Sequence, residues 1–194
     1  MLILASQSVS RQTMLEAAGI EFTAYPAHID ERALEAQLAG ATAPAIATAL
    51  AQAKAMTISQ ANPGRLVLGS DSLVEVAGRR FDKPANRHQA AEHLRFFSGR
   101  AMHLYSAAAL VKDGESLWHE VSMAALHTIE LSDEFIESYL THEWPLVAGC
   151  VGVFRIEGRG VQLFERIDGD HFTVMGMPLL AVITALRKLG ECSL

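Results

Sequence analysis

The sequence predicts an α/β (α+β) domain with a mixed twisted sheet, flanking helices and a central cleft. Short apolar runs typical of buried strands alternate with segments of helical periodicity in the first half of the chain. A long hairpin pattern follows, and a mostly apolar helix comes last. The carboxyl ends of parallel strands line a cleft where ligands usually bind. At 194 residues and 50% hydrophobic, the chain can enclose one core, so we expect a single domain over residues 1–194.

The first elements are a strand, a helix and a second strand. Residues 2–5 are apolar and predict a short buried strand. The helix that follows ends near Gly19, where a C-cap glycine is expected. Residues 21–25 predict the second strand, and residues 28–31 predict a polar loop that puts two carboxylates side by side.

Residues 44–60 form the clearest predicted helix, because the segment is rich in alanine and Pro44 suits its first turn. Residues 66–71 predict a buried strand that ends at Asp71, and residues 73–80 predict a short hairpin after it. We therefore expect Asp71 at the carboxyl end of a strand.

The second half of the chain contains three further helix signals and one long hairpin. Asn86 and Ser132 each precede an apolar pattern at helical spacing, and Pro178 suits the first turn of the last helix. The hairpin begins at residue 102 and turns at residues 112–115. Glycine-punctuated apolar segments separate the last two helices.

Composition and charge exclude several classes of function. The formal net charge of −6 argues against a nucleic-acid or membrane partner, although a local basic pocket can hold a small anionic substrate. No apolar run approaches the roughly 18 residues of a membrane span, and the amino terminus lacks the basic segment of a signal peptide. Cys150 and Cys192 are too few for a disulfide framework, so we expect reduced thiols in a cytoplasmic protein.

Two carboxylates are candidates for catalysis or metal binding. Asp71, on an apolar strand, can hold a metal or take a proton from an attacking water, whereas the alternative is a residue that starts a turn. Glu31, beside Asp30, can add a second oxygen ligand for magnesium, which binds through one or two carboxylates and keeps several waters. A solvated acidic loop is the alternative for this pair.

Four cations and one helix start are candidates for phosphate binding. Lys54, Lys83, Arg11 and Arg100 can neutralise a triphosphate, although each alone also fits an ordinary surface charge. The backbone amides from Ser8 onward start a helix and form a generic anion site, because the first turn has unpaired N–H groups.

Several motifs occur in one order from Leu2 to about Leu189 and together resemble the Maf family, also called septum-formation inhibitor proteins. The resemblance depends on the order of the motifs more than on any one of them. They are residues 4–11, similar to Leu-Ala-Ser-x-Ser-Pro-Arg-Arg, the acidic residues 29–31, Ala53-Lys54-Ala55, Gly69-Ser70-Asp71, Lys83-Pro84, the Ser-Gly-x-x-His-like residues 98–103, and residues 164–170 and 176–179.

The resemblance implies a fold similar to that of inosine triphosphatases and a nucleotide-pool house-cleaning activity. In that activity, nucleoside triphosphates are hydrolysed to the monophosphate and pyrophosphate. The resemblance makes Asp71 the proton acceptor and, with Glu31, a ligand of a divalent metal cation, magnesium or manganese. It assigns the binding of the substrate to Ser8, Arg11, Lys54 and Lys83.

Departures from the family pattern separate its branches. Val9-Ser10 replaces Pro-Arg, residues 143–149 lack the Asp-Lys of the dTTP/UTP branch, and Glu157 stands where that branch has glutamine. The segment around Glu157 resembles the branch that acts on 7-methyl-GTP, and Ser10, Ser72 and Glu157 fall at the positions that separate the branches. A carboxylate suits guanine, whose N1–H and 2-amino group both donate. We therefore expect a preference for 7-methyl-GTP, with dTTP or UTP as the alternative.

Two functions of other kinds stay open. The family name suggests a septum-formation inhibitor that acts in cell division by binding a protein, without turnover. A phosphatase or nucleotide transferase would use the same metal and cations but release different products. The resemblance also leaves open whether the chain is a monomer or a homodimer.

Overall fold

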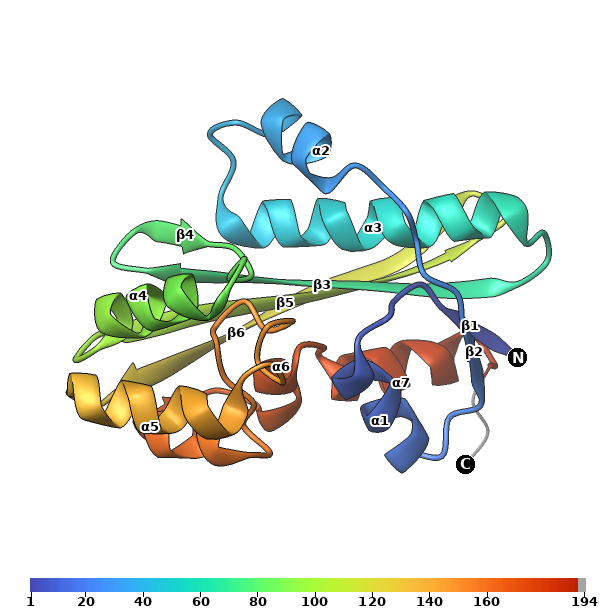
Figure 1. Cartoon of the computed structure of the whole chain (residues 1–194). Coiled ribbons are helices and arrows are strands. Elements are labelled where there is room, and N and C mark those ends of the chain that lie inside the picture. Colours follow the sequence, from blue (N-terminus) through green and yellow to red (C-terminus); the bar gives the residue numbers. More distant parts are fainter. Residues whose placement is uncertain (192–194) are drawn as a thin grey trace. The chain divides into compact units, whose positions relative to one another are not determined.

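The computed structural model describes residues 1–191 and has a mixed α/β fold (Figure 1). Within these residues the strands are β1 (Leu2–Leu4), β2 (Phe22–Ala24), β3 (Leu66–Val76), β4 (Arg79–Phe81), β5 (Ala101–Lys112), β6 (Glu115–Thr128) and β7 (Phe164–Asp168). They form one sheet in the order β2-β1-β3-β5-β6-β7, with β4 paired to β3. β1 is parallel to β2 and β3, whereas β3–β4 and β6–β7 are antiparallel. The predicted mixed sheet with flanking helices is confirmed.

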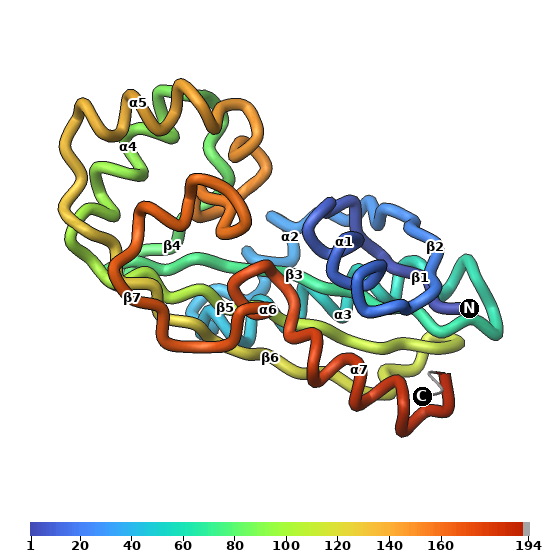
Figure 2. The backbone as a smooth tube through the Cα atoms, turned by 90° about the horizontal axis from the view of Figure 1, so that it is seen from below, coloured from blue at the N-terminus to red at the C-terminus, as the bar shows by residue number. Residues whose placement is uncertain are grey.

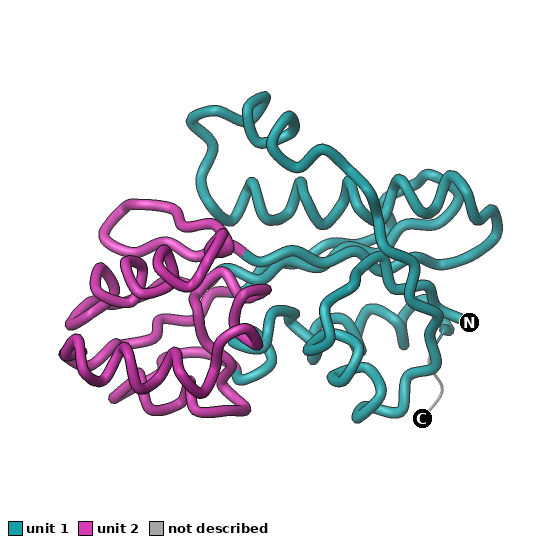
Figure 3. The backbone as a smooth tube through the Cα atoms, in the orientation of Figure 1, with its two compact units in different colours: residues 1–72, 105–122, 171–194 teal, residues 73–104, 123–170 magenta. Residues whose placement is uncertain are grey.

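The chain divides into two compact units (Figure 3). Unit 1 holds residues 1–72, 105–122 and 171–194, and unit 2 holds residues 73–104 and 123–170. Three of the four boundaries fall inside β3, β5 and β6, so each of these strands contributes residues to both units, and the fourth lies between β7 and α6.

In unit 1, alternation along β1 and β3 builds an apolar layer on each face of the strands. Leu4 and Leu68 pack with α1 and α7, whereas their neighbours Ile3 and Val67 pack with Ala55 of α3. Figure 1 shows α3 on one side of these strands and α1 and α7 on the other, and Figure 2 shows β1 beside β2. The helices of unit 1 are α1 (Val9–Ala17), α2 (Glu31–Gln37), α3 (Ala43–Ala61), α6 (His171–Met175) and α7 (Leu179–Lys188).

Unit 2 contains α4 (Arg87–Phe97), α5 (Asp133–Glu143) and the 3-10 helix η1 (Arg159–Leu163). The side chain of Asn86 caps α4 by accepting from the backbone N–H of residue 89 at 2.9 Å, and Ser132 caps α5 in the same way at 3.1 Å. The two predicted helix starts are therefore confirmed. None of the helices in residues 1–191 has the length and apolar content that a membrane crossing needs.

Two sequence predictions about local structure are wrong. Glu31 does not lie in a loop, because Asp30 caps α2 and Glu31 is its first residue. No residue of α2, which the structure describes in full, is buried, and the helix is only seven residues long, so its sequence signal is short. Asp71 is not at a strand end, because β3 continues to Val76. Much of β3 is buried on both faces, which removes the alternation that would show its extent.

Candidate functional site

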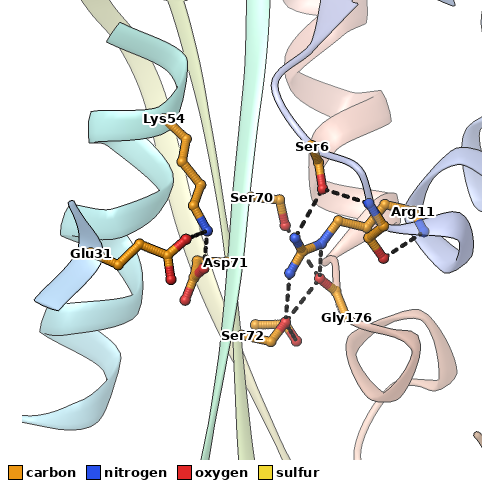
Figure 4. A network of polar contacts seen from close by, with 10 residues as sticks. Ser6, Arg11, Glu31, Lys54, Ser70, Asp71, Ser72 and Gly176 are labelled. Carbon is orange, nitrogen blue, oxygen red and sulfur yellow. Dashed lines mark hydrogen bonds and ion pairs between the residues drawn. The ribbon is translucent and has the colours of Figure 1, made fainter. Parts of the chain in front are cut away.

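Alternation along β3 divides its polar residues between two faces of the strand in unit 1 (Figure 4). Gly69 and Asp71 face α3, since a Cβ on Gly69 would meet the α3 backbone and Asp71 contacts a lysine of that helix. Ser70 and Ser72 point to the opposite face, where their hydroxyls lie 3.2 and 3.1 Å from the carbonyl of Gly176. Two polar groups result, one on each face of the strand.

Lys54, Glu31 and Asp71 form the first polar group (Figure 4). The Nζ of Lys54 lies 2.7 Å from Oε1 of Glu31 and 2.5 Å from Oδ1 of Asp71. The side chains of Lys54 and Asp71 are only 12% and 10% exposed, whereas that of Glu31 is 48% exposed. A buried ion pair therefore has a half-exposed carboxylate beside it, which leaves the group open to water or a ligand on one side.

Close packing of three elements brings this group together. Glu31 is the first residue of α2, which packs on α3, and Lys54 lies in the middle of α3. Gly69 lets β3 approach α3 closely, because an added Cβ would lie 2.8 Å from the backbone nitrogen of Ala55. Asp71 follows on the same face of β3, two residues further on, so the close approach puts its carboxylate within reach of Lys54.

The oxygen donors of this group fit an open site for a hard divalent cation. The two carboxylates already share one cation, the ammonium of Lys54. Magnesium binds proteins through one or two carboxylates and takes its other ligands from water and phosphate. In residues 1–191, no group of three or more His, Cys, Asp and Glu side chains could hold a metal ion. The donor set thus fits a cation that takes its remaining ligands from water and substrate, rather than a closed zinc-type cage.

Arg11 is the centre of the second polar group (Figure 4). Its Nε donates to the carbonyl of Gly176 at 2.9 Å, and its other nitrogens donate to Ser6 Oγ at 3.2 Å and Ser72 Oγ at 3.0 Å. Burial lowers the pKa of the Arg11 guanidinium, while two nearby carboxylates act in the opposite direction. The three bonds use three of its five N–H donors and join α1, β3 and the turn before α7.

Ser72 uses its hydroxyl proton inside the protein. Its Oγ lies 3.0 Å from Ser106 Oγ and 3.1 Å from the carbonyl of Gly176. Ser106 donates its own proton to the carbonyl of Thr173 at 2.8 Å, so Ser72 must supply any proton shared by the two serines. Ser72 therefore accepts from Arg11 and has two neighbouring oxygens to which its own proton can be donated.

Ser8 and Ser10 lie at the amino-terminal end of α1. The hydroxyl of Ser8 caps the helix by accepting from the backbone N–H of Arg11 at 3.4 Å, and the N–H of Ser8 donates to Ser6 Oγ at 3.2 Å. Ser10 lies in the first turn and is half-buried. The hydrogen bond from Arg11 to Ser72 brings the start of α1 beside β3. One region of unit 1 therefore holds Ser8, Ser10, Arg11 and Ser72.

The other two predicted residues, Lys83 and Glu157, belong to unit 2, and both are exposed. The charges of both residues act on the thiol of Cys150. Burial raises the pKa of Cys150, the charge of Glu157 adds to the rise, and the charge of Lys83 opposes it. Cys150 is a free cysteine, whereas Cys192 lies outside the described residues.

Arg100, a further candidate cation, contacts the end of its preceding helix. Its guanidinium lies 4.9 Å from the ring centroid of Phe96 and donates to the carbonyls of Phe96 and Ser98. These contacts are typical of an arginine that satisfies the last carbonyls of a helix. They favour the structural alternative for this residue over phosphate binding.

Sequence reasoning missed Ser106 and Glu143. Ser106 is fully buried in β5, where most of its neighbours are apolar, and a lone hydroxyl in such a strand indicates a buried polar partner. Glu143 is 4% exposed at the end of α5. Only its partners, which lie in a later loop, explain its burial, so no local sequence pattern could have identified it.

The fold and the first polar group define an α/β protein with a buried lysine–aspartate ion pair and a half-exposed glutamate beside its central strand β3. The chain belongs to the Maf-like protein family, whose model matches residues 1–189. The predicted resemblance to this family is confirmed.

Several relatives match the chain over nearly its whole length. A protein of Nitrobacter hamburgensis named nucleoside triphosphate pyrophosphatase is 46% identical, over 100% of this chain and 96% of that one. Proteins named 7-methyl-GTP pyrophosphatase in Rhizobium etli and Brucella suis are 46% and 43% identical, over 97% and 96% of this chain and 96% and 95% of theirs. Among solved structures, a HAM1 protein from Coxiella burnetii is similar over 66% of this chain and 72% of its own, with 17% identity and a TM-score of 0.41.

Proposed function

We propose that the protein is a nucleoside triphosphate pyrophosphatase, which hydrolyses a nucleotide to its monophosphate and pyrophosphate. Relatives that are 43% to 46% identical over nearly the whole chain are named for this activity. The observation that carries the proposal is the position of Asp71. Its carboxylate is buried beside an ammonium and a second carboxylate, and one side of this group is open to water and a ligand.

In the proposed reaction, Asp71 accepts a proton from the water that attacks the α-phosphorus. The water oxygen forms a new bond to phosphorus, and the bond from the α-phosphorus to the bridging oxygen breaks. Pyrophosphate leaves with the electron pair of that bond. The ion pair with Lys54 holds the Asp71 carboxylate in one orientation, which a general base needs.

Glu31 and Asp71 would hold the divalent cation, magnesium or manganese, in this reaction. Such a cation, when bound, supplies charge neutralisation and polarisation of phosphate oxygens. Lys54 pairs with the same carboxylates, so its ammonium would lie close to a phosphate bound at this site.

Phosphate binding is proposed for the start of α1 and for Lys83. The first-turn amides after Ser8 are suited to an anion, and two N–H donors of Arg11 remain after its three bonds. Lys83 is exposed, so its ammonium is accessible to a phosphate.

The base preference is proposed from Ser10, Ser72 and Glu157. The Glu157 carboxylate suits the two donors of a guanine edge, and Ser10 and Ser72 fall at the other positions that separate the branches of the family. We therefore propose 7-methyl-GTP as the preferred substrate, with dTTP or UTP as the second candidate. Cytoplasmic location, a homodimer and a link to cell division stay predictions from the sequence.

A screen of normal and modified nucleotides for release of pyrophosphate tests the proposal. We expect stoichiometric monophosphate and pyrophosphate in the presence of magnesium or manganese. In ¹⁸O-labelled water, attack on the α-phosphorus places the label in the monophosphate. Release of orthophosphate would indicate a phosphatase, transfer of a group to an acceptor would indicate a transferase, and no turnover with any nucleotide would favour a protein-binding function.

A further inference from the structure

The turn that carries Glu157 in unit 2 is closed by a hydrogen bond. The N–H of Gly158 donates to the carbonyl of Arg155 at 3.1 Å, which leaves residues 156 and 157 at the middle of a four-residue turn. Glu157 is exposed there. The two ends of this turn therefore set the backbone position from which the Glu157 side chain extends.

One buried carboxylate binds the first residue of the turn and the residue that follows the turn. Oε2 of Glu143 accepts from Nε and an NH2 nitrogen of Arg155 at 3.2 and 3.1 Å, and Oε1 accepts from the backbone N–H of Arg159 at 3.4 Å. The side chain of Glu143 is 5% exposed and that of Arg155 is 30% exposed. Glu143 is the last residue of α5, so the helix holds the loop residues on either side of Glu157.

A second residue of α5 holds the segment before the turn. Tyr139 lies one helical turn before Glu143, on the same face, and its hydroxyl donates to the carbonyl of Val153 at 2.9 Å. Burial raises the pKa of Tyr139, which keeps this hydroxyl protonated and able to donate. Val153 has a φ of 57°, an unfavourable value for a β-branched residue that this bond helps to maintain.

Glycines allow the turn to close tightly. A Cβ on Gly160 would lie 2.7 Å from the backbone nitrogen of Arg155, and a Cβ on Gly158 would lie 3.1 Å from the Arg155 guanidinium. Residues 155–160 thus pack against themselves and against Glu143, with little space for another arrangement. Such packing fixes the backbone that presents Glu157.

We propose that Glu143 is a positioning residue, which sets the base preference of the enzyme by holding Glu157 in place through Arg155 and Arg159. The inference rests on the proposed function, because it assigns Glu157 to the nucleotide base. Glu143 itself, being buried, contacts no substrate. Its loss is expected to affect discrimination between bases, which depends on the geometry of the Glu157 carboxylate, more than the hydrolysis step.

The test compares Glu143→Gln with Glu134→Gln, an exposed glutamate on the same helix. kcat/KM is measured for 7-methyl-GTP and for UTP in each variant, in both the wild-type and the Glu157→Gln background. We expect Glu143→Gln to lower the ratio of the two kcat/KM values about 3- to 10-fold. We expect no change in Glu134→Gln, and no further change when Glu143→Gln is added to Glu157→Gln. Equal losses for both nucleotides, or the same effect in both backgrounds, would overturn the proposal.

Two further measurements separate the positioning role from folding and from the proposed function. If Glu143→Gln fails to fold, Arg155→Lys takes its place. Lysine keeps the charge but cannot make both hydrogen bonds to Glu143, so we expect the ratio of the kcat/KM values to shift in the same direction. Hydrogen exchange at the amides of residues 155–159 reports the turn without substrate. Faster exchange in Glu143→Gln supports the positioning role even if the wild type releases no pyrophosphate, which would contradict only the proposed function. Unchanged exchange contradicts the positioning role.

Discussion

The ammonium of Lys54 on α3 lies 2.5 Å from the carboxylate of Asp71 on β3, and the same ammonium lies 2.7 Å from Glu31. One cation therefore separates two carboxylates that would repel each other in its absence. These are the two carboxylates that are proposed to hold a divalent cation, so Lys54 and the cation would share the same partners.

Replacing Lys54 with methionine tests this arrangement. Lys54→Met keeps the length of the side chain but leaves Asp71, 10% exposed, without the ammonium, so we expect a loss of about 1–3 kcal/mol in the free energy of unfolding. Magnesium should recover part of the loss, because it can occupy the position between the carboxylates. Thermal melts with and without magnesium measure both effects. Lys112→Met, on a half-exposed ion pair of 3.9 Å, is the control and should respond weakly to magnesium.

The close approach of β3 to α3 depends on Gly69. In Gly69→Ala the new methyl group meets backbone atoms of α3, which cannot move without displacing the helix, so we expect a destabilisation of about 1–3 kcal/mol and reduced turnover. Gly149→Ala is the matched control, because a Cβ there meets open space. Denaturant unfolding of the two variants gives the comparison, and equal stability would mean that the approach is not tight.

The three bonds of Arg11 predict that this residue stabilises the protein as well as binding phosphate. Arg11→Lys keeps the charge but cannot reach Ser6, Ser72 and Gly176 together, so we expect a loss of about 1–3 kcal/mol in the free energy of unfolding. Arg187→Lys, an exposed residue in the last turn of α7, should change the free energy by less than about 0.5 kcal/mol. A stable Arg11→Lys with a raised KM would assign Arg11 to substrate binding alone.

Metal dependence is expected to involve Glu31. Chelation with EDTA should stop turnover, and Glu31→Gln should raise the magnesium concentration for half-maximal rate by roughly tenfold, because one charged ligand becomes neutral. Glu16→Gln, exposed on α1, is the control. Turnover that survives EDTA, or a magnesium response of Glu31→Gln equal to that of the wild type, would remove Glu31 from the cation site.

The sequence predicts the sheet, most helices and the family well, since these depend on local apolar patterns and on ordered motifs. It fails for α2, whose faces carry no buried residue, and for β3, whose burial on both faces hides its length past Asp71. Because β3 continues past Asp71, its alternation puts Asp71 on the face toward Lys54 and Ser72 on the face toward Arg11. Ser106 and Glu143 act through partners far away in the sequence, so no local pattern can reveal them.

The most direct test is the amount of pyrophosphate released from 7-methyl-GTP, and from UTP in parallel, by wild-type protein and by Asp71→Asn. The asparagine keeps the volume of the side chain but cannot accept the proton of the attacking water, so we expect turnover to fall about 100- to 10,000-fold while the fold is retained. Circular dichroism and thermal melts of the variant check that the fold is intact. Wild-type rates in a folded Asp71→Asn would contradict the role of Asp71, and a wild type that releases no pyrophosphate from any nucleotide would contradict the proposed function itself.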